Sequence, residues 1–82
     1  MTASLGVAVI GAGMAGKAHA AAYRAASTLY SPVLPEIRLV AIGDVYAPLG
    51  EETAKRFGFE RHVADWRDIA AADDIDVVSV VV

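Results

Sequence analysis

The sequence contains no cysteine, which excludes disulfide bonds, thiol catalysis and cysteine-based metal sites. Its two histidines, at positions 19 and 62, are too few and too far apart to predict a metal site. Seven Lys and Arg residues are scattered among ten Asp and Glu residues, so no basic stripe exists. Nucleic-acid binding is therefore not expected, because it needs clustered positive charge to neutralise phosphates.

Long apolar runs are also missing. No run approaches the roughly 18 residues that a membrane span needs, and no basic segment precedes the first apolar run, as a signal peptide would require. We therefore expect a cytoplasmic protein with no membrane partner. Aromatic residues make up only 7% of the chain, whereas the hydrophobic share reaches 56%, chiefly through Ala and Val. Such small side chains let helices lie close to a sheet, which favours α/β packing.

The expected elements alternate between strands and helices. Short apolar runs predict strands over residues 5–10, 37–42, 61–63 and 75–82. Helix-forming segments predict helices over residues 14–26, about 48–57 and 65 to about 72. Pro32 and Pro35 predict a loop over 27–36. Asp65 is expected to cap the last helix, and Trp66 to anchor that helix to the sheet.

The order β-α-β-α-β-α-β predicts a parallel sheet with helices on both faces. Right-handed crossovers then give the strand order 3-2-1-4, so the fold class is an incomplete α/β Rossmann-type sheet. The Val-rich run at 75–82 is typical of a strand buried on both faces, yet this order leaves it at an edge. We therefore expect residues 1–82 to be the N-terminal part of a dinucleotide-binding domain in a longer chain whose substrate domain lies elsewhere, or the strand to pair with another chain.

Three glycines form a G-x-G-x-x-G motif between the first strand and the first helix. Gly11 permits a tight turn, Gly13 lets a pyrophosphate approach the backbone, and Gly16 lets the helix pack closely on the sheet. The N–H groups of Met14 and Ala15 are expected to point at that anion, which the helix dipole also favours. The motif therefore predicts a site for the pyrophosphate of a dinucleotide.

Asp44 ends the second strand, where an acid in this fold accepts hydrogen bonds from the adenosine ribose. It follows Gly16 by 28 residues, against about 20 in the general pattern, and the loop at 27–36 accounts for the excess. A carboxylate here repels a 2′-phosphate, and Val45 and Tyr46 follow in place of the Arg that is typical of NADP sites. We therefore expect NAD, with NADP as the alternative, and count Val45 among the cofactor-binding residues.

The sequence resembles the Gfo/Idh/MocA oxidoreductase family in four stretches, at residues 7–19, 39–44, 54–58 and 74–82. The resemblance implies a nicotinamide-binding Rossmann domain followed by an α+β domain. It also implies hydride transfer on a sugar, cyclitol or related polyol, and a homo-oligomer. Val81 and Val82 match a family position at the nicotinamide end of the cofactor. The family's catalytic lysine falls in a Glu-Lys-Pro motif that would come after Val82, so we assign no catalytic residue.

The sequence alone leaves two alternatives open. Family-like proteins can use the dinucleotide as a structural or regulatory ligand, so the second hypothesis is a non-catalytic NAD(P)-binding sensor. The third is a methyltransferase that binds S-adenosylmethionine through its first glycine-rich loop, although Ala15 and the short transition from Gly16 into the helix disfavour it.

Overall fold

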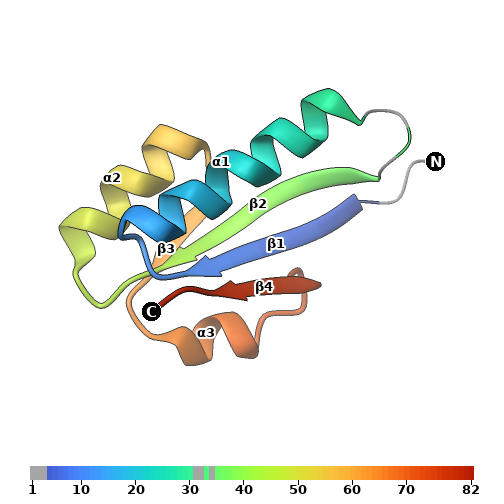
Figure 1. The fold of residues 1–82 in the computed structure, drawn as a ribbon. Helices are drawn as coiled ribbons and strands as arrows, with labels where there is room; N and C mark the ends of the chain where they lie inside the picture. Colours follow the sequence, from blue (N-terminus) through green and yellow to red (C-terminus); the bar gives the residue numbers. More distant parts are fainter. Residues whose placement is uncertain (1–3, 31–32, 34) are drawn as a thin grey trace.

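The computed structural model describes residues 4–30, 33 and 35–82. Its elements are β1 (Ser4–Ile10), α1 (Met14–Leu29), β2 (Glu36–Gly43), α2 (Ala47–Phe57), β3 (Arg61–Val63), α3 (Trp66–Ala70) and β4 (Val77–Val80). The four strands form one parallel sheet in the order β3-β2-β1-β4 (Figure 1). The fold class and the strand order predicted from the sequence are both confirmed.

Helices cover both faces of the sheet, with α1 and α2 on one face and α3 on the other (Figure 1). The core is divided in the same way. Val7 and Val9 of β1 pack in the cluster that includes residues of α1 and α2, whereas Ala8 packs in the cluster that includes Ile69 of α3. Because neighbouring residues of β1 are buried on opposite faces, the strand reads as a continuous apolar run rather than an alternating one.

Pairing between β1 and β2 is interrupted by one register shift. Val7 of β1 pairs with Leu39, but the next residue, Ala8, pairs with Ala41 rather than with Val40. Val40 is therefore an extra residue in β2, as in a β-bulge. Val40 and Ala41 both belong to the core cluster on the α3 side of the sheet. Consecutive residues of a regular strand point to opposite faces, so two neighbours on one face agree with an inserted residue.

The helix α1 continues three residues beyond its predicted end, so the loop predicted over 27–36 begins later than expected. The hydroxyls of Ser27 and Thr28 lie 3.4 Å from the carbonyl oxygens of Tyr23 and Arg24, one turn earlier. These bonds satisfy the hydroxyls inside the helix, so neither residue breaks it. Part of the predicted loop lies outside the described residues. Even with this extension, no helix in the described part of the chain is long and apolar enough to cross a membrane.

The helix α2 begins and ends with residues that are typical of helix ends. Pro48 lies in its first turn, and Gly58 ends it in a left-handed conformation with φ of 79°. Arg24 of α1 donates from Nε to the carbonyl oxygen of Phe57 at 2.7 Å. The last carbonyls of a helix lack partners within it, so this contact satisfies one of them and joins α1 to α2.

The strand β4 is shorter than predicted, because its ladder covers four residues of the expected span 75–82. Just before it, the backbone N–H of Asp76 donates to the carbonyl oxygen of Gly6 at 2.7 Å. Its carboxylate accepts from the Gly6 N–H at 2.8 Å, in place of a backbone carbonyl. The valines of β4 are 38–67% exposed. The strand therefore lies at a free edge, which is the position that the order 3-2-1-4 predicts for it.

The helix α3 ends before residue 72, and its anchor differs from the prediction. Asp65 caps it as expected, because its Oδ1 accepts from the Arg67 N–H at 2.9 Å. This cap places Trp66 at the first helical position, where its side chain is 52% exposed. Ile69, one turn later, faces the sheet and is 2% exposed. The prediction that Trp66 anchors this helix is therefore wrong, and Ile69 is the anchor.

The buried hydroxyl of Thr53, on α2, gives a test of how this helix packs. Its side chain is fully buried, and its hydroxyl has no hydrogen-bond partner among the described residues. A buried hydroxyl without a partner costs about 1–3 kcal/mol, so we predict that Thr53→Val raises the free energy of unfolding by about 1 kcal/mol. Chemical denaturation measures the difference. As the control, Thr53→Ser keeps the hydroxyl and should lower stability. A valine variant less stable than the parent would contradict the prediction.

Candidate functional site

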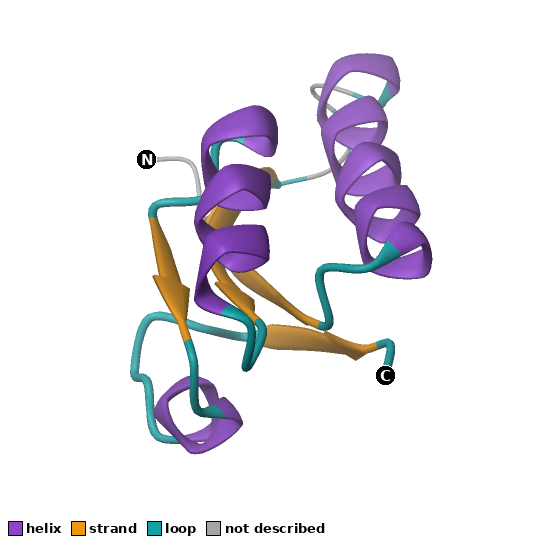
Figure 2. Ribbon diagram, turned by 90° about the vertical axis from the view of Figure 1, so that its left-hand side faces the viewer, coloured by secondary structure: helices purple, strands orange, loops and turns teal. Residues whose placement is uncertain are grey.

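The candidate site lies at the edge of the sheet where the strands end and the chain passes into the helices. Parallel strands place all their carboxyl ends at one edge, and ligands of open α/β sheets bind there. Figure 2 looks towards this edge and shows the loops that leave β1 and β2 beside each other. The first of these loops carries the glycine motif, and the second carries Asp44.

Gly11 makes the turn out of β1. Its φ is +109°, a conformation that L side chains rarely adopt. Its N–H donates to the carbonyl oxygen of Gly43 at 2.7 Å, which holds the turn against the end of β2. A Cβ at Gly11 would lie 2.2 Å from the carbonyl oxygen of Val81. The tight turn predicted for Gly11 is therefore confirmed, and Val81 closes its other side.

The other two glycines of the motif differ in their surroundings. A Cβ at Gly16 would lie 1.7 Å from the carbonyl oxygen of Gly11, so α1 begins in direct contact with the turn. A Cβ at Gly13 would have no described atom within 4 Å. The backbone of Gly13, with φ of −71° and ψ of −168°, is open to any residue. Neither the backbone conformation nor a neighbouring described atom therefore requires glycine at position 13, and the missing side chain leaves space in front of the helix.

The first turn of α1 presents backbone N–H groups to that space. Gly13 is the N-cap, and its carbonyl oxygen accepts from the Lys17 N–H at 2.9 Å, which closes the first helical turn. The N–H groups of Met14 and Ala15 precede that bond and have no partner within the helix. In the described structure no side chain caps them, and no acidic residue lies in this turn. Together with the helix dipole, this arrangement favours an anion.

Asp44 is held by four hydrogen bonds. Its Oδ2 accepts from the Ala12 N–H at 2.9 Å, and its Oδ1 accepts from the Tyr46 N–H at 2.8 Å. Its own N–H donates to the carbonyl oxygen of Val63 at 3.0 Å. Its carbonyl oxygen lies 3.1 Å from His62 Nε2. The carboxylate is therefore fixed against the glycine loop, while β3 holds the backbone behind it.

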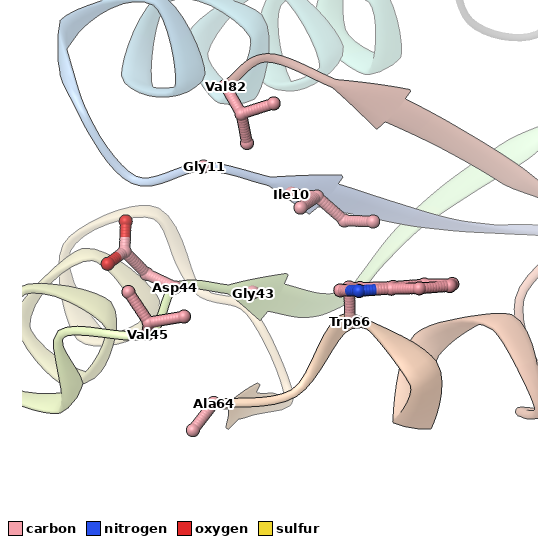
Figure 3. A pocket seen from close by; sticks show the side chains of 8 residues that line it. All are labelled: Ile10, Gly11, Gly43, Asp44, Val45, Ala64, Trp66 and Val82. Atoms are coloured by element: carbon pink, nitrogen blue, oxygen red, sulfur yellow. The ribbon is translucent and has the colours of Figure 1, made fainter.

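A pocket of about 170 Å³ opens beside Asp44 (Figure 3). The residues that line it are Ile10, Gly11, Gly43, Asp44, Val45, Ala64, Trp66 and Val82. In Figure 3 the side chains of Asp44 and Val45 lie on one side of the pocket, with Trp66 across from them. The lining is mostly apolar, with the Asp44 carboxylate as its one acidic group among the described residues. Such a lining suits a flat aromatic ligand with a polar end.

The structure brings four of the predicted site residues to this pocket, namely Gly11, Asp44, Val45 and Val82. Val81 lies behind the turn, where its N–H donates to the carbonyl oxygen of Ile10 at 2.8 Å. The remaining predicted residues, Gly13, Met14, Ala15 and Gly16, lie on the far side of the turn at the start of α1.

The sequence did not predict the residues that line the pocket after β3, nor the residue of β3 that contacts Asp44. Ala64 and Trp66 line the pocket from the segment that follows β3. The parallel sheet itself gives a signal for Ala64, since the residue after β3 must lie at the same edge as the residue after β2. His62, to which the sequence assigns no role in the site, is half-buried and contacts Asp44.

Charged side chains also lie at the start of α3, next to the pocket-lining Trp66. The Arg67 N–H that Asp65 accepts at the start of α3 holds the pKa of the Asp65 carboxyl below its ordinary value. The Arg67 guanidinium lies 4.9 Å from the centre of the Trp66 ring, within the range of a cation–π contact. No group of three or more potential metal ligands occurs within residues 4–30, 33 and 35–82.

Comparison with known proteins assigns the chain to a family. Residues 5–82 match the family model described as "Oxidoreductase family, NAD-binding Rossmann fold", known as Gfo/Idh/MocA. The chain belongs to this family. The resemblance inferred from the sequence is thus confirmed, and the family's description agrees with the expected cofactor, NAD.

Individual relatives cover nearly all of the chain. Levoglucosan dehydrogenase from Pseudarthrobacter phenanthrenivorans is 40% identical over 79 residues, which are 94% of this chain and 20% of that protein. A structure of levoglucosan dehydrogenase in complex with NADH has a TM-score of 0.85 and 38% identity, covering 98% of this chain and 22% of that one. An NAD-binding oxidoreductase from Klebsiella pneumoniae has a TM-score of 0.89 and 34% identity, covering 98% and 21%. The chain thus spans about a fifth of the length of these relatives.

Substituting alanine for Gly16 and for Gly13 should change the stability of the fold by different amounts. We predict that Gly16→Ala lowers the free energy of unfolding by about 2 kcal/mol or more, because its Cβ overlaps a backbone carbonyl. The matched variant Gly13→Ala should stay within about 0.5 kcal/mol of the parent, since its Cβ meets open space. Thermal and chemical denaturation of the two variants measure this. Equal losses in both would contradict the described geometry of the loop.

Proposed function

We propose that this chain is the nicotinamide-dinucleotide-binding portion of an oxidoreductase that transfers a hydride between NAD and a sugar, cyclitol or related polyol. The hydrogen bond from the Ala12 N–H to Asp44 Oδ2 is the observation that carries the proposal. It joins a carboxylate placed to bind a ribose to the glycine loop that leads into the first turn of α1. A dinucleotide presents a ribose and a pyrophosphate next to each other, and so matches this arrangement.

The pyrophosphate fits in front of Gly13. Its oxygens would accept hydrogen bonds from the N–H groups of Met14 and Ala15, and the absence of a Cβ at Gly13 lets the anion reach the backbone. The adenosine ribose would donate hydroxyl hydrogen bonds to Asp44. Each carboxylate oxygen can accept more than one hydrogen bond, so the backbone contacts that fix Asp44 do not use up its capacity.

The adenine base fits the pocket beside Asp44. Val45, Ala64 and Trp66 would form its apolar walls. Val82 lines the same pocket, so we place Val82 against the adenosine half of the cofactor rather than at the nicotinamide end that the resemblance implies. Bound NAD supplies the ring that takes up or releases the hydride, and the described residues hold the other half of the molecule.

NAD is favoured over NADP by the charges around Asp44. A 2′-phosphate would lie beside this carboxylate, and like charges repel. Val45 and Tyr46, which follow it, carry no positive charge. Of the cations on α2, Arg56 forms an ion pair with Glu52 one turn earlier on that helix. None of the residues that line the pocket is Lys or Arg, whereas one of them supplies the repelling carboxylate of Asp44. Arg67, which lies over the Trp66 ring, forms an ion pair with Asp65.

An enzyme is favoured over the two alternatives. The relatives with a named activity are dehydrogenases, and one is solved with NADH. This supports catalysis by the whole protein over a non-catalytic sensor, and a match to an NAD-binding family leaves the methyltransferase hypothesis without support. The proposed substrate, a sugar or polyol, rests on the family and on the relative that is named for levoglucosan.

Residues 1–82 are, in this proposal, the N-terminal part of a Rossmann domain in a longer protein that also carries a substrate domain. The free edge of β4 supports it, because an exposed Val-rich edge is suited to pair with a further strand. A homo-oligomer and a cytoplasmic location stay predictions from the sequence.

NADH binding by the full-length protein tests the proposal. We predict that calorimetric titration detects binding and that Gly13→Ala weakens it by about tenfold or more, because the new Cβ occupies the space in front of the helix. The control is Ala22→Ser, on the exposed side of α1, which should bind as the parent does. If the parent fails to bind NADH at millimolar concentration, the proposal is wrong.

Trp66 tests the position of the adenine. We predict that Trp66→Ala weakens the binding of ADP-ribose by about tenfold, since stacking of a base on an aromatic ring contributes about 1–3 kcal/mol. Trp66→Phe keeps a ring and should stay within about threefold of the parent. Ile69 anchors α3 independently, so the alanine variant should keep its circular dichroism spectrum. Unchanged affinity in a folded alanine variant would place the base elsewhere.

A further inference from the structure

His62 lies in β3, outside the motif, yet it contacts the residue to which we assign the ribose. Its Nε2 is 3.1 Å from the carbonyl oxygen of Asp44. A carbonyl oxygen only accepts hydrogen bonds, so Nε2 must carry the proton. Both the neutral ring protonated at Nε2 and the charged ring can make this bond.

The bond acts on a part of Asp44 that the sheet does not fix by itself. Asp44 follows the last residue of β2, and its N–H still pairs with Val63 of β3. Its carbonyl lies beyond the ladder, where the chain turns towards α2. By holding this carbonyl, His62 fixes the peptide that links Asp44 to Val45. The direction of that peptide determines where the carboxylate can reach, because Oδ1 accepts from the N–H of Tyr46, two residues on.

A glycine on α2 makes room for the imidazole. A Cβ at Gly50 would lie 2.1 Å from His62 Cδ2 and 2.3 Å from Nε2, so the ring packs directly on the helix backbone. Glycine inside a helix costs about 0.5–1 kcal/mol relative to alanine. Gly50 has a negative φ, so its conformation does not require glycine. The imidazole of His62 is what excludes a larger residue at this position.

We propose that His62 is a positioning residue for cofactor recognition: it orients Asp44 so that the carboxylate meets the 2′-hydroxyl of the adenosine ribose. The inference rests on the proposed function and adds a specific claim to it. His62 is not among the residues that line the pocket, so we expect it not to contact the cofactor directly. Its effect should therefore appear only with ligands that carry the hydroxyl.

The experiment compares NADH with its analogue that lacks the adenosine 2′-hydroxyl, on the full-length protein. The variants are His62→Met, which has no donor, and His62→Gln, whose side-chain nitrogen is the same number of bonds from Cβ as Nε2. We expect His62→Met to weaken NADH binding by about three- to tenfold and to leave the binding of the deoxy analogue within about twofold of the parent. His62→Gln should recover most of the lost NADH affinity.

Gly50→Ala tests the same inference without changing His62. Its Cβ displaces the ring, so it should reduce the preference for NADH over the deoxy analogue as His62→Met does. In the double variant Gly50→Ala with His62→Ala, stability should recover because the overlap is removed, while the preference should stay low. This pair keeps the inference testable if His62→Met folds poorly.

Four results would overturn the inference. Equal losses for both ligands in His62→Met and Gly50→Ala would show a packing role alone. Unchanged NADH affinity in the folded variants would show that Asp44 needs no such support. A parent that binds both ligands equally would refute the ribose role of Asp44, yet leave NADH binding intact. A parent that binds neither ligand would instead refute the proposed function itself, and this inference with it.

Discussion

The hydrogen bond between the Ala12 N–H and Asp44 Oδ2 connects the two parts of the candidate site. The glycine loop and the end of β2 belong to successive βα units, and a parallel sheet brings them to one edge. Proximity alone would leave Asp44 as a solvated acid at the end of a strand. The bond to Ala12 fixes its carboxylate at the base of α1, next to backbone N–H groups that favour an anion. A carboxylate that lies next to an anion site matches a ligand that carries hydroxyls beside phosphates.

The register of the sheet sets which residue of the glycine loop lies opposite Asp44. The extra residue in β2, Val40, shifts the pairing so that Ile10 lies opposite Gly43. The ladder then continues one step further, where the Gly11 N–H donates to the Gly43 carbonyl at 2.7 Å. If Val40 paired with Ala8 instead, Ile10 would lie opposite Ile42, and Asp44 would come opposite Ala12 rather than Gly11. A bulge in the middle of the sheet thus sets the geometry of its edge.

The order and type of the elements could be predicted because each one carries its own local signal, such as the Ala-rich helix α1 or Gly58 at the end of α2. Asp44 could be predicted because its position at a strand end is also local. The bulge at Val40 could not, since it depends on which face Val40 and Ala41 pack against. The exposure of Trp66 and the contact of His62 with Asp44 depend on the placement of α3 and β3 across the sheet, which no local pattern encodes.

The glycine motif contains less information about a ligand than its length suggests. Gly11 needs its positive φ, and Gly16 is required by the carbonyl of Gly11, whose oxygen would lie 1.7 Å from a Cβ. These two glycines are therefore needed to join β1 to α1 in this geometry, whether or not anything binds. Gly13 alone has open space around its missing Cβ and a conformation that any residue can adopt. The ligand-specific content of the motif lies in Gly13, and it becomes specific for a dinucleotide only through Asp44, thirty-one residues further along the chain.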